Sequence, residues 1–325
     1  MKLSRKNLVK KLLTLIGLST ALLSHAQTYP NKPIRLVIPS SAGTPVDILS
    51  RVVAVKMANE LGQAVVVENK VGAGGIVGMQ DILRQPADGY TLMSIYRGMV
   101  LTPHIFRNVS MDIQRDFAAV GQSLFTYNVL LVNPKVPANS VVELANLIKS
   151  KPGQLNFASG GIASPAHLAG ELFSQKVGSK LTHVPYLAFP QALGDLMGGQ
   201  VEMMFSATAP AMGHIESGKV KALAVTSSRR LPSLKDIPTM AEMGYPEVTL
   251  RDWMGLMVKT GTPTDVIDRL NSALLKALSS DDVRQSFARL GAEPAGGTAA
   301  DFAALIAQDT NSLVQLARNA SIRAD

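Results

Sequence analysis

The side chains most able to bind a ligand gather in two short loops, residues 40–44 and 159–165. Both combine serine or threonine with glycine, and each lies between an apolar strand-like run and a helix-like segment. A loop in that place presents hydroxyls and unpaired backbone NH groups at a helix N-terminus, which favours anions. Helix capping alone would use the same groups, so either loop by itself leaves both interpretations open. Two such loops in one chain favour a cleft that binds a small carboxylate.

Other arrangements of potentially reactive residues give weaker evidence for a functional site. Residues 72–78 resemble a dinucleotide-binding loop, but no acidic residue about 20 positions later ends a strand to hold a ribose. The histidines lack the spacing of a helical metal pair, and we expect His167 to pack against the neighbouring loop. Residues 159–161 lack the first glycine of a nucleophile elbow, although a triad assembled by tertiary structure leaves no sequence pattern. We therefore expect no cofactor, no metal and no catalysis.

The chain has 325 residues, of which 46% are hydrophobic and 17% charged, with a formal net charge of +8. Five of its basic residues lie within residues 2–11, an apolar run follows at 12–23, and Ser24-His25-Ala26 ends it. This order is typical of a secretory signal peptide, which we place at residues 1–26. Without it the charge falls to 27 basic against 24 acidic residues, or +3. Nucleic-acid binding is therefore not expected.

The composition also bears on where the protein works. The chain has no cysteine, so it lacks the residue that anchors a bacterial lipoprotein. No later segment holds the roughly 18 apolar residues that a membrane-spanning helix needs. We expect an exported, soluble protein of the periplasm.

Short runs rich in Val, Ile and Leu alternate with segments of helical periodicity along most of the chain. Continuous apolar strands separated by helices predict mainly parallel sheets with helices on both faces. From residue 264 onward the pattern is helical, and such a tail covers an existing lobe more easily than it builds a third. We predict an α/β protein of two lobes, with residues 27–128 and 250–325 in the first and 129–249 in the second.

The motifs in order along the chain resemble the Bug-type receptors, the extracytoplasmic solute-binding proteins of tripartite tricarboxylate transporters. The resemblance covers essentially all of the chain after residue 26. It rests on Tyr29–Arg35, Gly43 with Asp47, Val65–Lys70 with Gly72–Gly75, Ala87–Leu92, Asp116-Phe117, Ser159-Gly160, Ser164-Pro165, His167–Glu171, His183–Tyr186, Gly198–Val201, Ala222–Thr226, Pro238-Thr239 and Gly291–Pro294.

The resemblance implies a Venus-flytrap architecture, in which two lobes joined by crossing strands close on one ligand. Family ligands are mostly carboxylates, held by backbone amides, hydroxyls and bridging waters. By motif position this implies ligand contacts from Ser40, Ser41, Gly43, Thr44, Ser159, Gly160, Ser164, Tyr186, Ala188, Phe189, Ser206 and Thr208. Asp47 matches the family acid, and we expect it to fix the loop and the helix start because it would repel an anion.

This chain departs from the family pattern at residues that bear on ligand choice. After Tyr186 the family usually reads Lys-Gly-Gly, whereas this chain has Leu187-Ala188-Phe189. Ser206 stands where many members have aspartate. These changes predict a less charged and more apolar cleft, and losing the aspartate argues against a ligand ammonium group. We expect a carboxylate with an apolar or aromatic body, or a dicarboxylate.

The resemblance implies a transport receptor, expected to be a monomer, that hands its ligand to the membrane permease subunits in a transient complex. Two alternatives stay open at this stage. The same closed form could act as a co-receptor for a sensor kinase, with identical binding residues. A secreted hydrolase is the other, and it would turn its ligand over.

Overall fold

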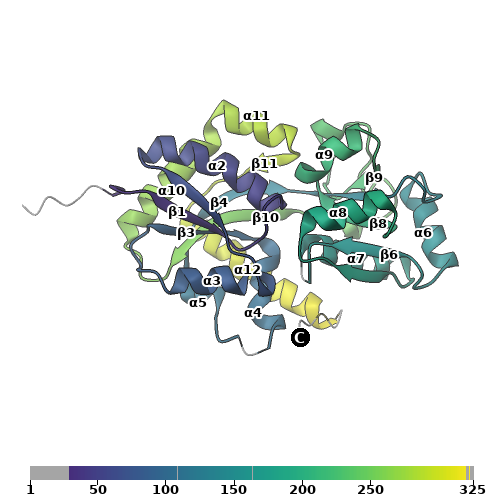
Figure 1. Cartoon of the computed structure of the whole chain (residues 1–325), viewed down its shortest axis with the longest axis horizontal. Coiled ribbons are helices and arrows are strands. Elements are labelled where there is room, and N and C mark those ends of the chain that lie inside the picture. Colours follow the sequence, from purple (N-terminus) through teal and green to yellow (C-terminus); the bar gives the residue numbers. More distant parts are fainter. Residues whose placement is uncertain (1–28, 108, 163, 320–321, 323–325) are drawn as a thin grey trace, which may run out of the picture.

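The computed structural model describes residues 29–107, 109–162, 164–319 and 322, and shows two lobes, each built on a sheet covered by helices (Figure 1). The first sheet has the order β11-β4-β10-β3-β1-β2, with β11 Ala292–Pro294, β4 Phe117–Thr126, β10 Asp252–Lys259, β3 Thr91–Tyr96, β1 Ile34–Ile38 and β2 Val65–Asn69. The second has the order β7-β6-β8-β5-β9, with β7 Thr182–Pro185, β6 Asn156–Ser159, β8 Met203–Ala207, β5 Asn128–Val132 and β9 Lys221–Val225.

The helices pack on both faces of each sheet. In the first lobe these are α2 Pro45–Leu61, α3 Ile76–Leu83, α4 Thr102–Ile105, α5 Ile113–Asp116, α10 Thr264–Ser279, α11 Asp281–Arg289 and α12 Ala299–Asn319, with single 3-10 turns at Ala73–Gly75 and Arg97–Leu101. In the second they are α6 Val141–Ser150, α7 Pro165–Val177, α8 Phe189–Gly198 and α9 Thr208–Glu216, with 3-10 turns at Pro232–Leu234 and Pro246–Val248. The C-terminal helices α10, α11 and α12 pack against elements of the first sheet and its other helices.

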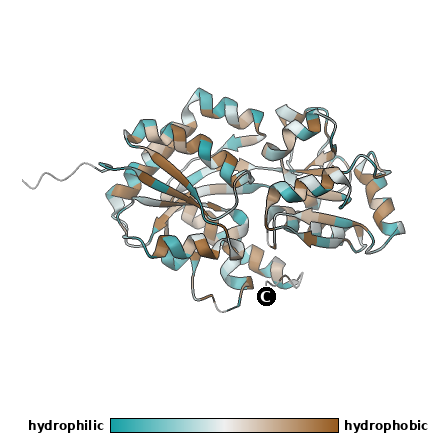
Figure 2. Ribbon diagram, in the orientation of Figure 1, coloured by the Kyte–Doolittle hydropathy of each residue, from teal (hydrophilic) through white to brown (hydrophobic). Residues whose placement is uncertain are grey.

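Each lobe has two hydrophobic clusters, one on each face of its sheet. In the first lobe α2, α10 and α11 cover one face, with Leu49 and Leu270 fully buried, while α3 and α12 cover the other around Met79 and Phe302. In the second lobe α6 and α7 cover one face and α8 and α9 the other. Figure 2 shows hydrophobic residues gathered on the strands and hydrophilic ones on outer helix surfaces such as that of α11.

The sheets are mixed rather than mainly parallel, which corrects that part of the prediction. Parallel pairing joins β1 to β2 and β3, and β6 to β7 and β8, while the other pairings between named strands are antiparallel. The cause is the path of the chain, which enters the second lobe through β4 and β5 and returns through β10. Because β4 and β10 run in opposite directions between the lobes, they pair antiparallel.

The two longest strands, β4 and β10, lack the continuous apolar run by which buried strands are recognised in a sequence. Gly121, Gln122 and Ser123 interrupt the apolar run of β4, and β10 begins at an aspartate and contains Gly255. A Cβ at Gly255 would collide with the Phe302 ring, so this strand position accepts only glycine beneath α12.

The predicted signal peptide, residues 1–26, lies outside the described residues. Within the part of the chain that the structure describes, no helix combines the length and the apolar character needed to cross a bilayer. The first sheet takes its strands from residues 34–126 and 252–294, and the second from 128–225. The predicted lobe boundaries at 128/129 and 249/250 stay predictions.

Candidate ligand-binding cleft

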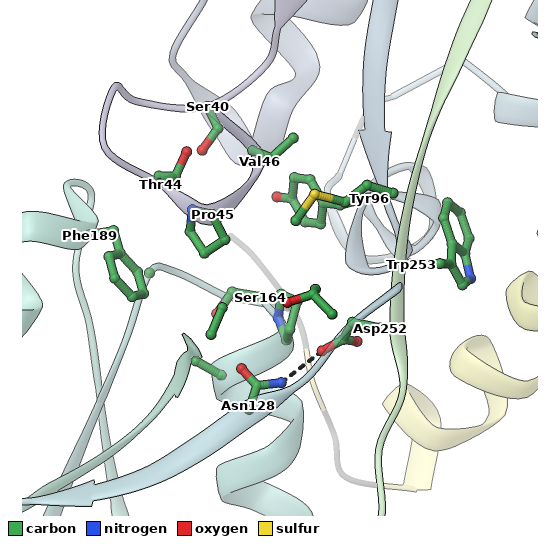
Figure 3. A pocket seen from close by; sticks show the side chains of 16 residues that line it. Ser40, Thr44, Pro45, Val46, Tyr96, Asn128, Ser164, Phe189, Asp252 and Trp253 are labelled. Carbon is green, nitrogen blue, oxygen red and sulfur yellow. Dashed lines mark hydrogen bonds between the residues drawn. The ribbon is translucent and has the colours of Figure 1, made fainter. Parts of the chain in front are cut away.

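A cleft lies between the two lobes, with about 600 Å³ of space that protein atoms leave empty, part of it open to solvent (Figure 3). It is lined by residues from both lobes and from the strands that join them: Ser40, Thr44, Pro45, Val46, Tyr96, Thr126, Asn128, Gly160, Ser164, Pro165, Ala166, Phe189, Ala207, Asp252, Trp253 and Met254.

The loop before α2 forms the wall contributed by the first lobe. Thr44 is the N-cap of α2: its Oγ1 accepts from the Asp47 NH at 3.4 Å and donates to the Ser41 carbonyl at 2.7 Å. Proline at the first helical position suits the fixed φ of a helix start. The local sequence thus sets both the loop and the direction of the helix, whose N-terminus faces the cleft.

Asp47 holds this loop from behind, as predicted. Its carboxylate accepts from the Gly43 NH at 3.0 Å, from Arg51 Nε at 2.9 Å and from Asn69 Nδ2 at 3.0 Å. Burial opposes the charged form, but these hydrogen bonds outweigh it and lower the pKa of Asp47 below its ordinary value. Asp47 is therefore ionised and committed to the scaffold.

The loop before α7 forms the facing wall. Ser164 is the N-cap of α7, and its Oγ accepts from the His167 NH at 3.3 Å. A Cβ at Gly160 would lie 3.2 Å from Phe189 Cδ2, so the absence of a side chain there lets the phenyl ring form part of the wall. Hydroxyls and the N-termini of two helices thus meet at the cleft from opposite lobes.

The lobes also touch each other beside the cleft. A Cβ at Gly43 would lie 3.3 Å from Pro190 Cγ in the opposite lobe. Thr208 Oγ1, on the second lobe, donates to the carbonyls of Leu290 and Gly291 on the first, at 2.9 and 3.1 Å. The structure therefore holds the lobes close together.

The structure brings five of the predicted contact residues to the cleft lining: Ser40, Thr44, Gly160, Ser164 and Phe189. The other seven, Ser41, Gly43, Ser159, Tyr186, Ala188, Ser206 and Thr208, lie outside that lining. Ser206 and Thr208 are fully buried, with their hydroxyls bonded to backbone carbonyls. The Tyr186 hydroxyl donates to Asp195 at 2.8 Å.

Ser159 and His183 form a pair whose spacing resembles that of a nucleophile and its base. Ser159 Oγ lies 2.6 Å from His183 Nε2, but Ser159 is fully buried and its Oγ also bonds to the backbone of Gly161. His167 stacks on the ring of His183, which lies on β7, with centroids 3.8 Å apart. Burial, together with His167, lowers the pKa of His183 to about 3, which makes it a poor base. The geometry favours a structural role for the pair.

The floor of the cleft lies where the two crossing strands meet, and sequence reasoning missed it. Asn128 Nδ2 donates to Asp252 Oδ2 at 2.7 Å, joining the start of β5 to the start of β10 (Figure 3). Thr126, the register partner of Asp252, lies beside them on β4. The sequence offered one signal for this floor, namely polar residues near the predicted lobe boundaries. The chain must cross from one lobe to the other at those boundaries.

Asp252 is the one acidic residue among the described residues that line the cleft, and it is 5% exposed. Burial raises its pKa, against the opposing effects of Arg97 and the Asn128 hydrogen bond, while Asp309 adds to the rise. Arg97 Nη1 lies 4.0 Å from Asp252 Oδ1, whereas its Nε lies 3.2 Å from Asp309 Oδ2. The arginine is therefore bound chiefly to Asp309.

The remaining walls are apolar. Val46 and Phe189 face the space from the first and second lobes, and Met254 lies on β10. Tyr96 also lines the cleft, and burial raises the pKa of its hydroxyl to about 12, so it stays neutral. A cleft with donors at the helix ends and apolar walls suits an anion with an apolar body.

Comparison with known proteins agrees with this geometry. The model of the tripartite tricarboxylate transporter family receptor matches residues 49–321. Protein BugT of Bordetella pertussis is 35% identical over 271 residues, which cover 83% of each chain. A protein encoded between tcbD and tcbE in Pseudomonas sp. strain P51 is 34% identical over 283 residues, covering 87% of this chain and 84% of the relative.

Solved structures show the same likeness. The periplasmic binding protein BugD is 32% identical, with a TM-score of 0.85 over 91% of this chain and 100% of that one. Rpa4515 of R. palustris, solved with adipate, is 29% identical with a TM-score of 0.86, covering 91% and 99%. MatC of Rhodopseudomonas palustris, solved with bound malate, is 28% identical with a TM-score of 0.82, covering 89% and 99%. The chain belongs to the tripartite tricarboxylate transporter receptor family and is a Bug-type receptor.

Proposed function

We propose that this protein is a periplasmic receptor that captures a small carboxylate with an apolar body and delivers it, unchanged, to the membrane subunits of a tripartite tricarboxylate-type transporter. One observation carries the proposal: two helix N-termini with Thr44 and Ser164 as their caps meet at one interlobe cleft with apolar walls. Structures of family members with adipate and malate support a carboxylate as the ligand class.

The proposed contacts follow from what each wall offers. The ligand carboxylate accepts from the hydroxyls of Ser40 and Ser164 and from the Gly160 NH, close to the positive ends of α2 and α7, whereas the Thr44 hydroxyl holds the loop by donating to the Ser41 carbonyl. The apolar body packs against Val46 and Phe189. None of the described residues in the lining is Lys, Arg or His, so backbone dipoles and neutral donors stabilise the charge of the ligand carboxylate.

Ligand capture is coupled to lobe closure in this proposal. A ligand that touches both lobes at once has a higher affinity for the closed form, and only such a difference shifts the equilibrium. The permease subunits would recognise the closed form. Asn128 and Asp252, whose hydrogen bond joins the two crossing strands, lie at the centre of that movement.

A thermal-shift screen tests the proposal on protein purified from the periplasmic fraction of expressing cells. A carboxylate panel of aliphatic mono- and dicarboxylates, citrate-like acids, amino acids and aromatic acids is compared with sugars and divalent metals. Ligand at 100 times its Kd adds about 2.7 kcal/mol to the free energy of unfolding. Stabilisation by sugars or metals alone would overturn the carboxylate assignment, and a chemically altered ligand after incubation would overturn the receptor role.

A further inference from the structure

The floor of the cleft is a second polar surface, formed by the strands that cross between the lobes rather than by the capped helices. It consists of Thr126, Asn128 and Asp252, on the strands that cross between the lobes. Figure 3 shows Ser40 and Thr44 at one side of the space and the bonded pair Asn128 and Asp252 at the other. A ligand whose carboxylate sits at the N-terminus of α2 can therefore direct its far end at the floor.

The floor has unused capacity to form hydrogen bonds. Thr126 is 3% exposed, and its Oγ1 has no hydrogen-bond partner within the described part of the chain. A buried hydroxyl without a partner is costly. One oxygen of Asp252 accepts from Asn128, while the other lies 4.0 Å from Arg97, beyond hydrogen-bond distance. That second oxygen is available to accept from a ligand.

The charge around the floor decides which ligand groups fit. None of the described residues that line the cleft is Lys, Arg or His, so the lining carries no cation to neutralise a second carboxylate. Arg97 stands behind Asp252 and is engaged by Asp309 through two hydrogen bonds of 3.2 and 3.3 Å. Asp252 repels an anionic group, whereas it accepts from a hydroxyl and attracts an ammonium group.

We propose that this floor, Thr126 with Asn128 and Asp252, selects carboxylic acids that carry a hydroxyl or amino group at their far end and discriminates against dicarboxylates. The proposal rests on the proposed function, because it assumes that a ligand carboxylate occupies the helix ends. It revises the expectation that the ligand has no ammonium group, which was drawn from serine replacing aspartate at Ser206. Asp252 supplies the negative charge that Ser206 lacks.

Isothermal titration at pH 7.5 tests this with acids that share a skeleton and differ only at the far end. One series is hexanoate, 6-hydroxyhexanoate, 6-aminohexanoate and adipate, and the other is the para-substituted benzoates with methyl, hydroxymethyl, aminomethyl and carboxylate groups. Within a series that binds, the acids that end in a hydroxyl or amino group should bind at least about tenfold more tightly than those that end in a methyl or carboxylate group. This is the difference expected for hydrogen bonds to a charged group.

Three variants assign the effect to the floor. The Asp252→Asn protein should bind the amino-ended acid about tenfold more weakly than the wild type and should bind the dicarboxylate more tightly. Asp268→Asn removes the same charge from an exposed position on α10 and should leave both unchanged. Thr126→Val should weaken binding of the hydroxy acid several-fold without lowering the melting temperature, because Oγ1 has no partner to lose.

The outcomes separate this inference from the proposed function. If acids bind and the carboxylate-ended member is the tightest, or if Asp252→Asn leaves the ranking unchanged, the floor assignment is wrong and the receptor function stands. If Thr126→Val loses stability but not affinity, Thr126 is structural only and the floor does not include it. If no carboxylate binds the wild-type protein, both proposals fail together.

Discussion

Replacing Ser164 by alanine separates a cap from a ligand contact. The Ser164 hydroxyl accepts from the His167 NH at 3.3 Å, a long hydrogen bond at the start of a thirteen-residue helix. Losing an N-cap costs about 1 kcal/mol of the free energy of unfolding, and the length of this bond places it no higher. For a chain of this size, that corresponds to a fall of roughly 2 °C in melting temperature.

The effect on binding should be larger. A hydrogen bond to a charged group contributes about 1.5–3 kcal/mol, so losing the Ser164 donor should raise the Kd for the carboxylate at least about tenfold. Urea denaturation gives the change in stability, and isothermal titration with the acid found in the screen gives the Kd. Ser164→Thr keeps both the cap and the hydroxyl, and should retain most of the affinity.

Ser140→Ala is the matched control for this variant. Ser140 caps α6, where its Oγ accepts from the Glu143 NH at 3.1 Å, and it does not belong to the cleft lining. It should cost about the same stability as Ser164→Ala and leave the Kd unchanged. If both variants lose similar stability and both keep wild-type affinity, Ser164 is only a cap and the proposed second-lobe contact is refuted.

Three further predictions concern residues that support the cleft. Asp47→Asn should lower the free energy of unfolding by about 1–3 kcal/mol and weaken ligand binding, because the Gly43 loop loses a charged acceptor. Urea denaturation near neutral pH measures this change, and an unchanged free energy of unfolding would contradict the prediction. Burial lowers the pKa of His183 to about 3, so the unfolded chain gains the proton first and stability should fall as the pH drops from about 6.5. Because His183 is partly exposed, we expect a loss of only about 1 kcal/mol by pH 4.5, and denaturation curves of His183→Gln should be flatter over that range. Thr208→Val removes the hydrogen bonds to Leu290 and Gly291, so it should favour lobe opening and raise the Kd a few-fold; an unchanged Kd and an unchanged small-angle scattering profile would contradict this.

The parts of the site that the sequence predicted are those made by neighbouring residues. The loops that hold Thr44 and Ser164 were identified because their hydroxyl-bearing residues come a few positions before a helix. The role of Asp47 was predictable for the same reason, since Gly43 and Arg51 lie within one helical turn of it. Such patterns depend on hydrogen bonds between residues a few positions apart, so they can be recognised without knowing the tertiary structure.

Sequence patterns did not show how hydroxyls are used once the chain folds. Ser206 and Thr208 lie at the carboxyl end of β8, where ligand contacts would be expected, yet the fold gives their hydroxyls to backbone carbonyls, and Thr208 bonds across to the other lobe. Ser159 likewise pairs with His183, which is 24 positions away. Whether a hydroxyl is free depends on which distant carbonyl or ring lies next to it.

By itself the sequence determined the alternation of strands and helices, the two capped loops and the membership of the family. Only the tertiary structure decided that the sheets are mixed and that Asn128 meets Asp252, 124 positions later, at the floor of the cleft. The physical reason is the range of the interactions. Capping and periodicity act within a few residues, whereas the pairing of β4 with β10 is fixed by burial of the whole core and leaves no pattern in either strand alone.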